Sequence, residues 1–224
     1  MMAQTLSTVR ESIPRPRIQT LSDMIFGLAL SIGAVSLLSQ KPGNFTAVTY
    51  SMVSFGFAFL ILALVWFRYS KIMSVLPVES SGIFSANMLL LFLVSIEPYL
   101  FNLMTVSAYS PAPGQLDSGS TTTLYALDLG GLMLILAFFV HELTSEERRL
   151  IPRELIRDYR LTMYTTILAG LLFLISTLPV FWGIIVIASP AIPIRYLLWT
   201  GVWAANMGRR LDIRMTNRRS GMER

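Results

Sequence analysis

Few side chains in this sequence of 224 residues are suited to chemistry, and their spacing defines no reactive centre. The chain has no cysteine and a single histidine, His141. Thiol catalysis, disulfides, zinc sites and two-histidine iron sites therefore cannot be assembled within one chain. The carboxylates of Asp23, Glu97 and Asp128 have no spacing to a serine that is typical of a base and its nucleophile. The sequence predicts no enzyme, no metal site and no cofactor.

The residues around these groups are organised as membrane spans. Hydrophobic residues make up 54% of the chain and charged residues only 14%, whereas about a quarter of an ordinary soluble domain is charged. The apolar residues fall into blocks of about 20, the length that crosses a bilayer as a helix. We therefore expect an all-α integral membrane protein, with one membrane domain over residues 19–208. Its six predicted helices cover residues 19–39, 47–67, 83–106, 122–143, 161–188 and 192–208.

The last two predicted helices are interrupted by proline. Pro179, Pro190 and Pro193 all fall in this region, and a proline inside a span kinks it and frees a carbonyl. A break after Leu178 is therefore an open alternative to a helix that continues to residue 188.

Lysine and arginine gather on one side of the predicted membrane. They occur in the N-terminal segment of residues 1–18, in the predicted loops of residues 68–82 and 144–160, and in the tail of residues 209–224. Only Lys41 and Arg195 lie on the other side. Cytoplasmic flanks collect these residues, so both ends are predicted to be cytoplasmic. The net charge of +5 then reflects membrane orientation and contact with anionic lipids rather than nucleic-acid binding.

The first predicted helix opens with polar groups. Ser22 and Asp23 stand at the membrane entrance, where they either cap the start of the helix or mark a functional site. Arg17 and Asp23 are six residues apart and do not share a helix face. We expect each to reach a neighbouring helix or a neighbouring subunit.

Two stripes follow along the same helix. Leu28, Ile32 and Val35 share one face, and a stripe of small residues, Gly27, Ser31 and Ala34, lies beside it. Small residues let membrane helices approach closely, so the second stripe is predicted to be a packing face. From spacing alone, the bulky face is open to three interpretations: lipid contact, bundle core or pore lining.

The combination of Arg17, Leu21, Ser22 and Asp23 at the start of the first of six spans resembles the transmembrane protein 175 family of potassium-permeable channels. Further similar features are Trp66 at the end of the second span, and Asn87 and Pro98 in the third.

The resemblance implies a prokaryotic single-repeat channel in the cell membrane, assembled as a homotetramer around a pore lined by the first helix. The narrowest ring would be Leu28, followed by Ile32 and Val35, with Ser31 as a hydroxyl in contact with potassium ions. Arg17, Ser22 and Asp23 would anchor the pore helix.

The sequence also departs from the family pattern. Leu21 replaces the commoner phenylalanine, Met24 stands where a small residue is frequent, and the histidine expected after Trp66 is absent, with Arg68 and Tyr69 nearby. No T-V-G-Y-G segment is present, so an apolar constriction would have to handle ion dehydration and could close by dewetting. The alternative function is a non-conducting accessory or scaffold membrane protein.

Three further charged residues lie toward the outer side of the predicted spans. Glu97 is in the third span, Asp128 is in the fourth, and Arg195 begins the sixth. Charges in hydrocarbon are costly and usually find partners. We therefore predict that Arg195 pairs with one or both carboxylates as a clamp between helices.

Overall fold

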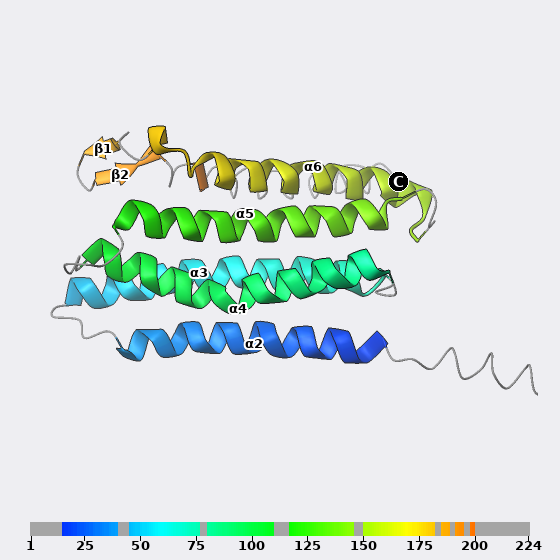
Figure 1. The fold of residues 1–224 in the computed structure, drawn as a ribbon, viewed down its shortest axis with the longest axis horizontal. Coiled ribbons are helices and arrows are strands. Elements are labelled where there is room, and N and C mark those ends of the chain that lie inside the picture. Colours follow the sequence, from blue (N-terminus) through cyan, green and yellow to red (C-terminus); the bar gives the residue numbers. More distant parts are fainter. Residues whose placement is uncertain are drawn as a thin grey trace, which may run out of the picture. The chain divides into compact units, whose positions relative to one another are not determined.

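In the residues that it describes, the structure, a computed structural model, is helical apart from one small hairpin (Figure 1). It describes residues 15–39, 45–76, 80–109, 117–145, 150–181, 185–188, 191–194 and 198–199. The α-helices are α2 (Arg15–Ser39), α3 (Phe45–Met73), α4 (Ser81–Tyr109), α5 (Ser118–Leu143) and α6 (Arg153–Ile175). They are followed by the 3-10 helix η1 (Pro179–Phe181) and the strands β1 (Ile185–Ala188) and β2 (Ala191–Pro193).

Four of the described helices are long and apolar enough to cross a membrane. They are α2 to α5, and their apolar windows are Ile18–Val35, Ser51–Met73, Ser81–Thr105 and Ser118–Leu143. In α6 the first turns, as far as Arg160, are rich in arginine and carboxylates. Only the uncharged stretch from Leu161 to Ile175 remains, which is shorter than the ~20 residues of a full span.

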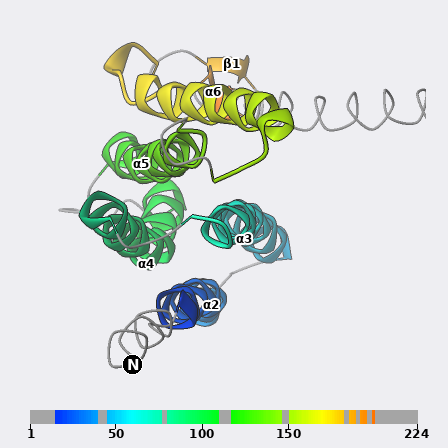
Figure 2. The same ribbon diagram turned by 90° about the vertical axis from the view of Figure 1, so that its right-hand side faces the viewer.

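Residues 1–99 form one compact unit, in which α2 packs beside α3 (Figure 2). The buried positions of α2 are Ser22, Phe26, Ala29 and Gly33. Their spacing of three and four residues places them on one helix face. A Cβ atom on Gly33 would lie 3.3 Å from the ring of Phe55, so a larger residue here would have to displace that ring.

Residues 100–224 form the second unit, in which α5 and α6 lie side by side. The two helices approach closely at Gly130 and Gly170. A Cβ atom on Gly170 would lie 3.2 Å from the carbonyl oxygen of Gly130, and one on Gly130 would lie 3.3 Å from that of Gly170. The pair of glycines therefore brings the two backbones together, as small residues do between membrane helices.

An aromatic cluster stabilises the same unit. Trp199 is 2% exposed, and its ring lies 5.6 Å from Phe173 and 6.0 Å from Tyr125. The Trp199 indole Nε1 also donates a hydrogen bond of 3.0 Å to Ser176 Oγ. A buried indole needs such a partner, so this bond fixes Trp199 against the end of α6.

The first four predicted helices agree with α2 to α5, but the fifth ends earlier than residue 188, close to the alternative break after Leu178. A helix was expected over residues 161–188, whereas α6 begins at Arg153 and ends at Ile175. Strands β1 and β2 then pair antiparallel as a hairpin. The chain breaks after Ile175 because prolines follow and because β-branched residues such as those of Ile185–Ala188 favour strands.

The prediction of a sixth helix over residues 192–208 is wrong at its start, because residues 191–193 belong to strand β2 rather than to a helix or a loop. From residue 194 onward only Ile194, Leu198 and Trp199 are described, and all three are helical. The rest of that predicted span and the tail of residues 209–224 lie outside the described residues.

Candidate functional site

Helix α2 presents an apolar face that no other part of residues 1–99 covers in the described structure. Leu21, Met24, Leu28, Ile32 and Val35 are all exposed, at 46%, 68%, 60%, 47% and 61%. At ~100° per residue their side chains fall within one stripe of about 80°. Because the rise is ~1.5 Å per residue, Leu28, Ile32 and Val35 form successive levels along ~10 Å of the helix.

The opposite face of α2 is fixed by a buried chain of hydrogen bonds. Ser22 Oγ lies 2.7 Å from the Tyr69 hydroxyl, which donates a hydrogen bond of 2.7 Å to Asn87 Oδ1. The carbonyl of Asn87 can only accept, so Tyr69 is the donor there. The Ser22 hydroxyl has one hydrogen, and two acceptors lie within its reach: the Tyr69 oxygen and the Ile18 carbonyl, which is 2.8 Å away. One tyrosine therefore connects α2, α3 and α4.

Asp23 makes a second connection between α2 and α3. Its Oδ1 accepts a hydrogen bond of 2.9 Å from the indole Nε1 of Trp66. Helix α2 is already helical at Arg15, about two turns before these residues. The interpretation of Ser22 or Asp23 as a helix cap is therefore wrong, and Asp23 contacts the neighbouring helix. Arg17 lies in the first turn of α2, but its side chain lies outside the described part of the structure.

Tyr69 was missed as a partner of these residues at the sequence level, where it stood only near the position of the absent histidine. The available signal was its type, because a tyrosine buried within an apolar span must find a partner for its hydroxyl. Tyr69 is 1% exposed and packs its ring 5.5 Å from that of Phe26 on α2. It thus holds α2 by ring contact as well as by hydrogen bonding.

The small residues of α2, predicted to be a packing face, are not packed against other residues in the part of the chain that the structure describes. Gly27, Ser31 and Ala34 are exposed, and a Cβ atom on Gly27 would have nothing within 4 Å among the described residues. The Ser31 hydroxyl donates to the Gly27 carbonyl at 2.8 Å. Its hydrogen is therefore committed to the helix backbone, while the lone pairs of its oxygen remain on the exposed side.

An apolar groove of about 290 Å³ runs beside the exposed face of α2. Leu28, Ile32 and Leu21 line it from α2, and Met88 and Phe92 line it from α4. The groove extends the apolar surface of α2 onto α4 within residues 1–99.

The structure describes two of the three charged residues that were predicted toward the outer side of the spans. Glu97 and Asp128 are buried, at 2% and 3% exposure, in α4 and α5. The side chain of Arg195 lies outside the described residues, so the pairing of Arg195 with these carboxylates stays a prediction. Among the described residues, no group of three or more histidine, aspartate or glutamate side chains could hold a metal ion.

The helices that carry these contacts match a known protein family. Residues 17–98 match the family described as the endosomal/lysosomal potassium channel TMEM175. They cover most of α2, all of α3 and α4 as far as Pro98, and thus contain Ser22, Asp23, Trp66, Tyr69 and Asn87. The family resemblance that the motif predicted is confirmed.

The fold is similar to that in the crystal structure of the potassium channel MtTMEM175, solved as a variant in complex with a Nanobody–MBP fusion protein. The TM-score is 0.55 at 20% sequence identity, and the likeness covers 88% of this chain and 93% of that chain. No curated protein matches the sequence.

Proposed function

We propose that this chain, whose residues 17–98 carry the signature of the TMEM175 family, forms a potassium-permeable channel in a membrane. Both the family and the similar structure are described as potassium channels, not as enzymes. The four membrane-length helices α2 to α5 fit a protein embedded in a bilayer.

In the proposed channel, copies of α2 surround the pore. The observation that carries this proposal is the division of α2 into two faces: Ser22, Phe26, Ala29 and Gly33 are buried, while Leu28, Ile32 and Val35 are exposed. A helix that lines a pore needs one face held by its own subunit and another that points toward the axis. The resemblance to the family favours four copies, with each subunit in a prokaryotic cell membrane and both ends in the cytoplasm.

Leu28 would form the narrowest ring, with Ile32 and Val35 as the next levels. Such side chains offer no ligands to an ion, so passage requires partial dehydration or a wider, wetted pore. Potassium gives up water more readily than sodium, so a narrow apolar ring favours potassium. The oxygen of Ser31 would compensate in part, because its hydrogen bond to Gly27 leaves lone pairs for a cation.

Ser22 and Asp23, through Tyr69 and Trp66, would hold the pore helix in its orientation, and Arg17 would complete the motif. The hydrogen bonds from Ser22 to Tyr69 and from Trp66 to Asp23 support this role, since both reach from α2 to α3. The exposed small residues Gly27 and Ala34 are suited to close contact with a second copy of α2.

Flux through purified protein in liposomes tests the proposal. We expect potassium flux in liposomes loaded with potassium, and Leu28→Ala should raise the flux while lowering the preference for potassium over sodium. A rise of roughly tenfold corresponds to ~1.4 kcal/mol taken from the barrier. The measurement is the potassium-dependent dissipation of a membrane potential, reported by a fluorescent dye.

Leu60→Ala is the matched control, because Leu60 on α3 is 59% exposed and Leu28 is 60% exposed. The control should leave flux and selectivity unchanged. Absence of flux from the wild-type protein, or equal behaviour of Leu28→Ala and Leu60→Ala, would contradict the proposed pore. A non-conducting protein that also purifies as a single subunit would be better described as an accessory or scaffold protein.

A further inference from the structure

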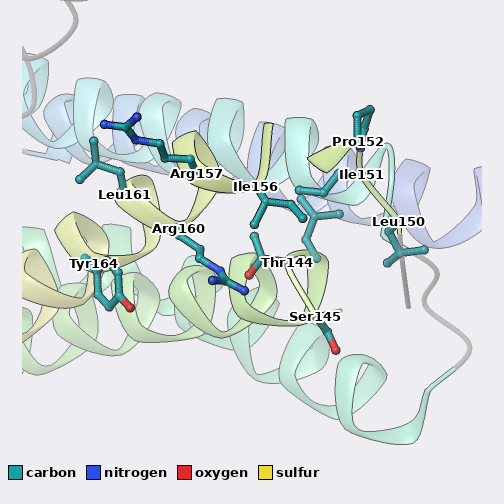
Figure 3. Close-up of a pocket in the computed structure, with 11 residues that line it drawn as sticks. Thr144, Ser145, Leu150, Ile151, Pro152, Ile156, Arg157, Arg160, Leu161 and Tyr164 are labelled. Carbon is teal, nitrogen blue, oxygen red and sulfur yellow. The ribbon is translucent and has the colours of Figure 1, made fainter. Parts of the chain in front are cut away.

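The groove beside α2 and α4 is continuous with the face of α2 that is proposed to line the pore, because Leu28 and Ile32 belong to both. A second pocket lies at the connection between α5 and α6 (Figure 3). Arg157 and Arg160 line that pocket, but in Figure 3 their guanidinium groups point in different directions and do not converge on one ligand. The groove is therefore the surface whose partner can be inferred.

The groove and the small residues of α2 lie on opposite sides of its exposed apolar stripe. At ~100° per residue, Ile25 and Ala29, which line the groove, lie ~60° and ~100° to one side of Leu28. Gly27 is exposed and lies ~100° to the other side. A stripe that points toward a pore axis thus has the groove on one flank and small residues on the other.

A closed ring of more than two copies uses two different surfaces of each copy. One surface contacts the next copy, and the other contacts the previous copy. If α2 lines the pore, its two flanks are these surfaces, so the inference rests on the proposed function. The groove of one copy then meets the small residues of its neighbour.

Two contacts fix the level of α4 relative to α2. Tyr69 joins Ser22 of α2 to Asn87 of α4. A Cβ atom on Gly33 of α2 would lie 4.0 Å from the Cβ atom of Pro98 on α4. The separation in sequence is the same for Ser22 and Asn87 as for Gly33 and Pro98. The two helices therefore run in the same direction and keep one register along this length.

In this register, two exposed small residues of α2 are level with two exposed aromatic residues of α4. Gly27 is level with Phe92, which lines the groove and is 58% exposed. Ala34 is level with Tyr99, which is 65% exposed. Phe92 and Tyr99 are seven residues apart and share a face of α4.

Rotation about an axis along the membrane normal does not change the depth of a residue. The level pairs of one copy are therefore also level between neighbouring copies. At both levels a small residue of one copy meets a large residue of the other, which is the size match that close packing of helices needs.

We propose that the groove and the adjoining face of α4 bind a second copy of this chain. The contacts are two level pairs, Phe92 on Gly27 and Tyr99 on Ala34, each between neighbouring copies. A lipid acyl chain also suits an apolar groove, but it would not need residues of matched size at two levels. The match at both levels is what assigns the groove to a second copy.

Cysteine cross-linking tests the proposal, because the chain has no cysteine of its own. Membranes that contain Gly27→Cys with Phe92→Cys are oxidised with copper phenanthroline and analysed on a non-reducing gel. Within one copy the two positions face away from each other across the apolar stripe, so a disulfide can form only between copies. We expect loss of the single-chain band to a ladder of covalent oligomers, which a reducing agent reverses. Ala34→Cys with Tyr99→Cys should give the same ladder.

Single variants test the direction of the contact. Neither Gly27→Cys nor Phe92→Cys alone should form covalent dimers, whereas the two single variants should cross-link to each other when they are produced in one cell. Gly27→Cys with Leu60→Cys is the matched control, because Leu60 on α3 is 59% exposed. Leu60 lies ~120° around α3 from Trp66, which contacts α2, so this pair should keep the single-chain band.

The proposal would be overturned if both cross-linking pairs kept only the single-chain band, which is also the result expected if lipid fills the groove. The same ladder from the Leu60 control would overturn it too. Covalent dimers of Gly27→Cys alone would mean that the small residues of two copies face each other. Potassium flux without these cross-links would leave a channel with another interface, whereas cross-links without flux would leave the interface without a conducting pore.

Discussion

The hydroxyl of Tyr69 links residues that are far apart in the sequence. It lies 2.7 Å from Ser22 Oγ on α2 and 2.7 Å from Asn87 Oδ1 on α4. The motif residues and Asn87 were identified from sequence, but the residue that joins them was not. Spacing indicates which residues share a helix face and does not indicate which helix lies opposite.

Removal of this hydroxyl tests its contribution to stability. Tyr69→Phe keeps the ring contact with Phe26 but loses two hydrogen bonds between helices. Such bonds average ~0.6 kcal/mol each in membrane proteins, so we expect a loss of about 1 kcal/mol. The thermal midpoint in detergent should fall by about 2–4 °C, measured by tryptophan fluorescence.

Tyr99→Phe provides the control, since Tyr99 on α4 is 65% exposed and undergoes the same chemical change. Its midpoint should equal that of the wild type. Equal midpoints for both variants would mean that the buried network does not stabilise the fold.

Asp117 caps helix α5 and gives a prediction for pH. Its carboxylate accepts hydrogen bonds from the Ser120 hydroxyl and from the backbone N–H groups of Ser120 and Gly119. These bonds, that of the Ser120 hydroxyl first, hold the pKa of Asp117 below its usual value. The stabilisation is therefore present above the unfolded pKa, near 4, and is lost as pH falls through the lower folded pKa.

Asp117→Asn should retain a cap while removing this part of the pH dependence. Midpoints measured between pH 6 and pH 3 should fall less steeply for this variant than for the wild type. A wild-type slope in Asp117→Asn would exclude the cap as its source.

At the scale of elements, the sequence predicted the exposed apolar stripe of α2 but not the face that the chain buries. The stripe of Leu28, Ile32 and Val35 follows from helical periodicity, and the structure exposes it. The small stripe of Gly27, Ser31 and Ala34 was expected to pack, but the chain buries Ser22, Phe26, Ala29 and Gly33 instead. In a membrane, apolar and small residues can face lipid, another subunit or a helix of the same subunit. The residue types of a helix face therefore do not predict which of these it contacts.

The end of α6 marks a second limit of the sequence pattern. Hydropathy continues through Ile185–Ala188 and therefore does not distinguish an apolar strand from an apolar helix. Pro179 and Pro193 were recognised as interruptions, and a break after Leu178 was left open. The pairing of β1 with β2 depends on contacts between strands, which local propensity only favours.

The contact between α5 and α6 gives a prediction for glycine. Gly170→Ala would place a Cβ atom 3.1 Å from the Leu134 side chain and 3.2 Å from the Gly130 carbonyl oxygen. The backbone atom cannot move without separating the helices, so we expect a loss of about 1–3 kcal/mol. The thermal midpoint should fall accordingly.

Gly56→Ala is the matched control, because a Cβ atom at Gly56 in α3 would meet nothing within 4 Å among the described residues. Alanine is the better helix former, so this variant should be as stable as the wild type or more stable. If the midpoint of Gly170→Ala also failed to fall, the close approach of α5 and α6 would be wrong.

At the scale of the whole molecule, orientation is the most direct property to test, because the chain has no cysteine of its own. Ser118 and Ser74 are exposed, beside the start of α5 and the end of α3. The positive-inside pattern predicts Ser118 outside the cell and Ser74 in the cytoplasm. In intact cells an impermeant maleimide should label Ser118→Cys, and it should label Ser74→Cys only after permeabilisation.

The reverse labelling pattern would place the basic ends of the chain outside. Labelling of both variants in intact cells would contradict the assignment of α4, which lies between the two positions, as a complete span. Either result can be read without knowledge of ion flux, so it tests the fold separately from the proposed pore.

The whole-molecule architecture was predictable as far as single-chain patterns extend. The lengths of α2 to α5 follow from apolar blocks that match the thickness of a bilayer. The family signature covers residues 17–98, which contain the motif and its partners on α3 and α4. Contacts between subunits depend on a second chain, and no periodicity within one sequence specifies them.

The exposed apolar face of α2 has a consequence for the number of assembled pores in a cell, if the protein forms the proposed channel. Hydrocarbon solvates leucine, isoleucine and valine as well as a protein interior does, so a single subunit in the bilayer suffers no hydrophobic penalty. Subunits then associate by modest packing forces, and their association obeys mass action. For a pore made of four copies, the number of pores at low density rises as the fourth power of subunit abundance. Small changes in synthesis or degradation would therefore act as a steep switch on conductance.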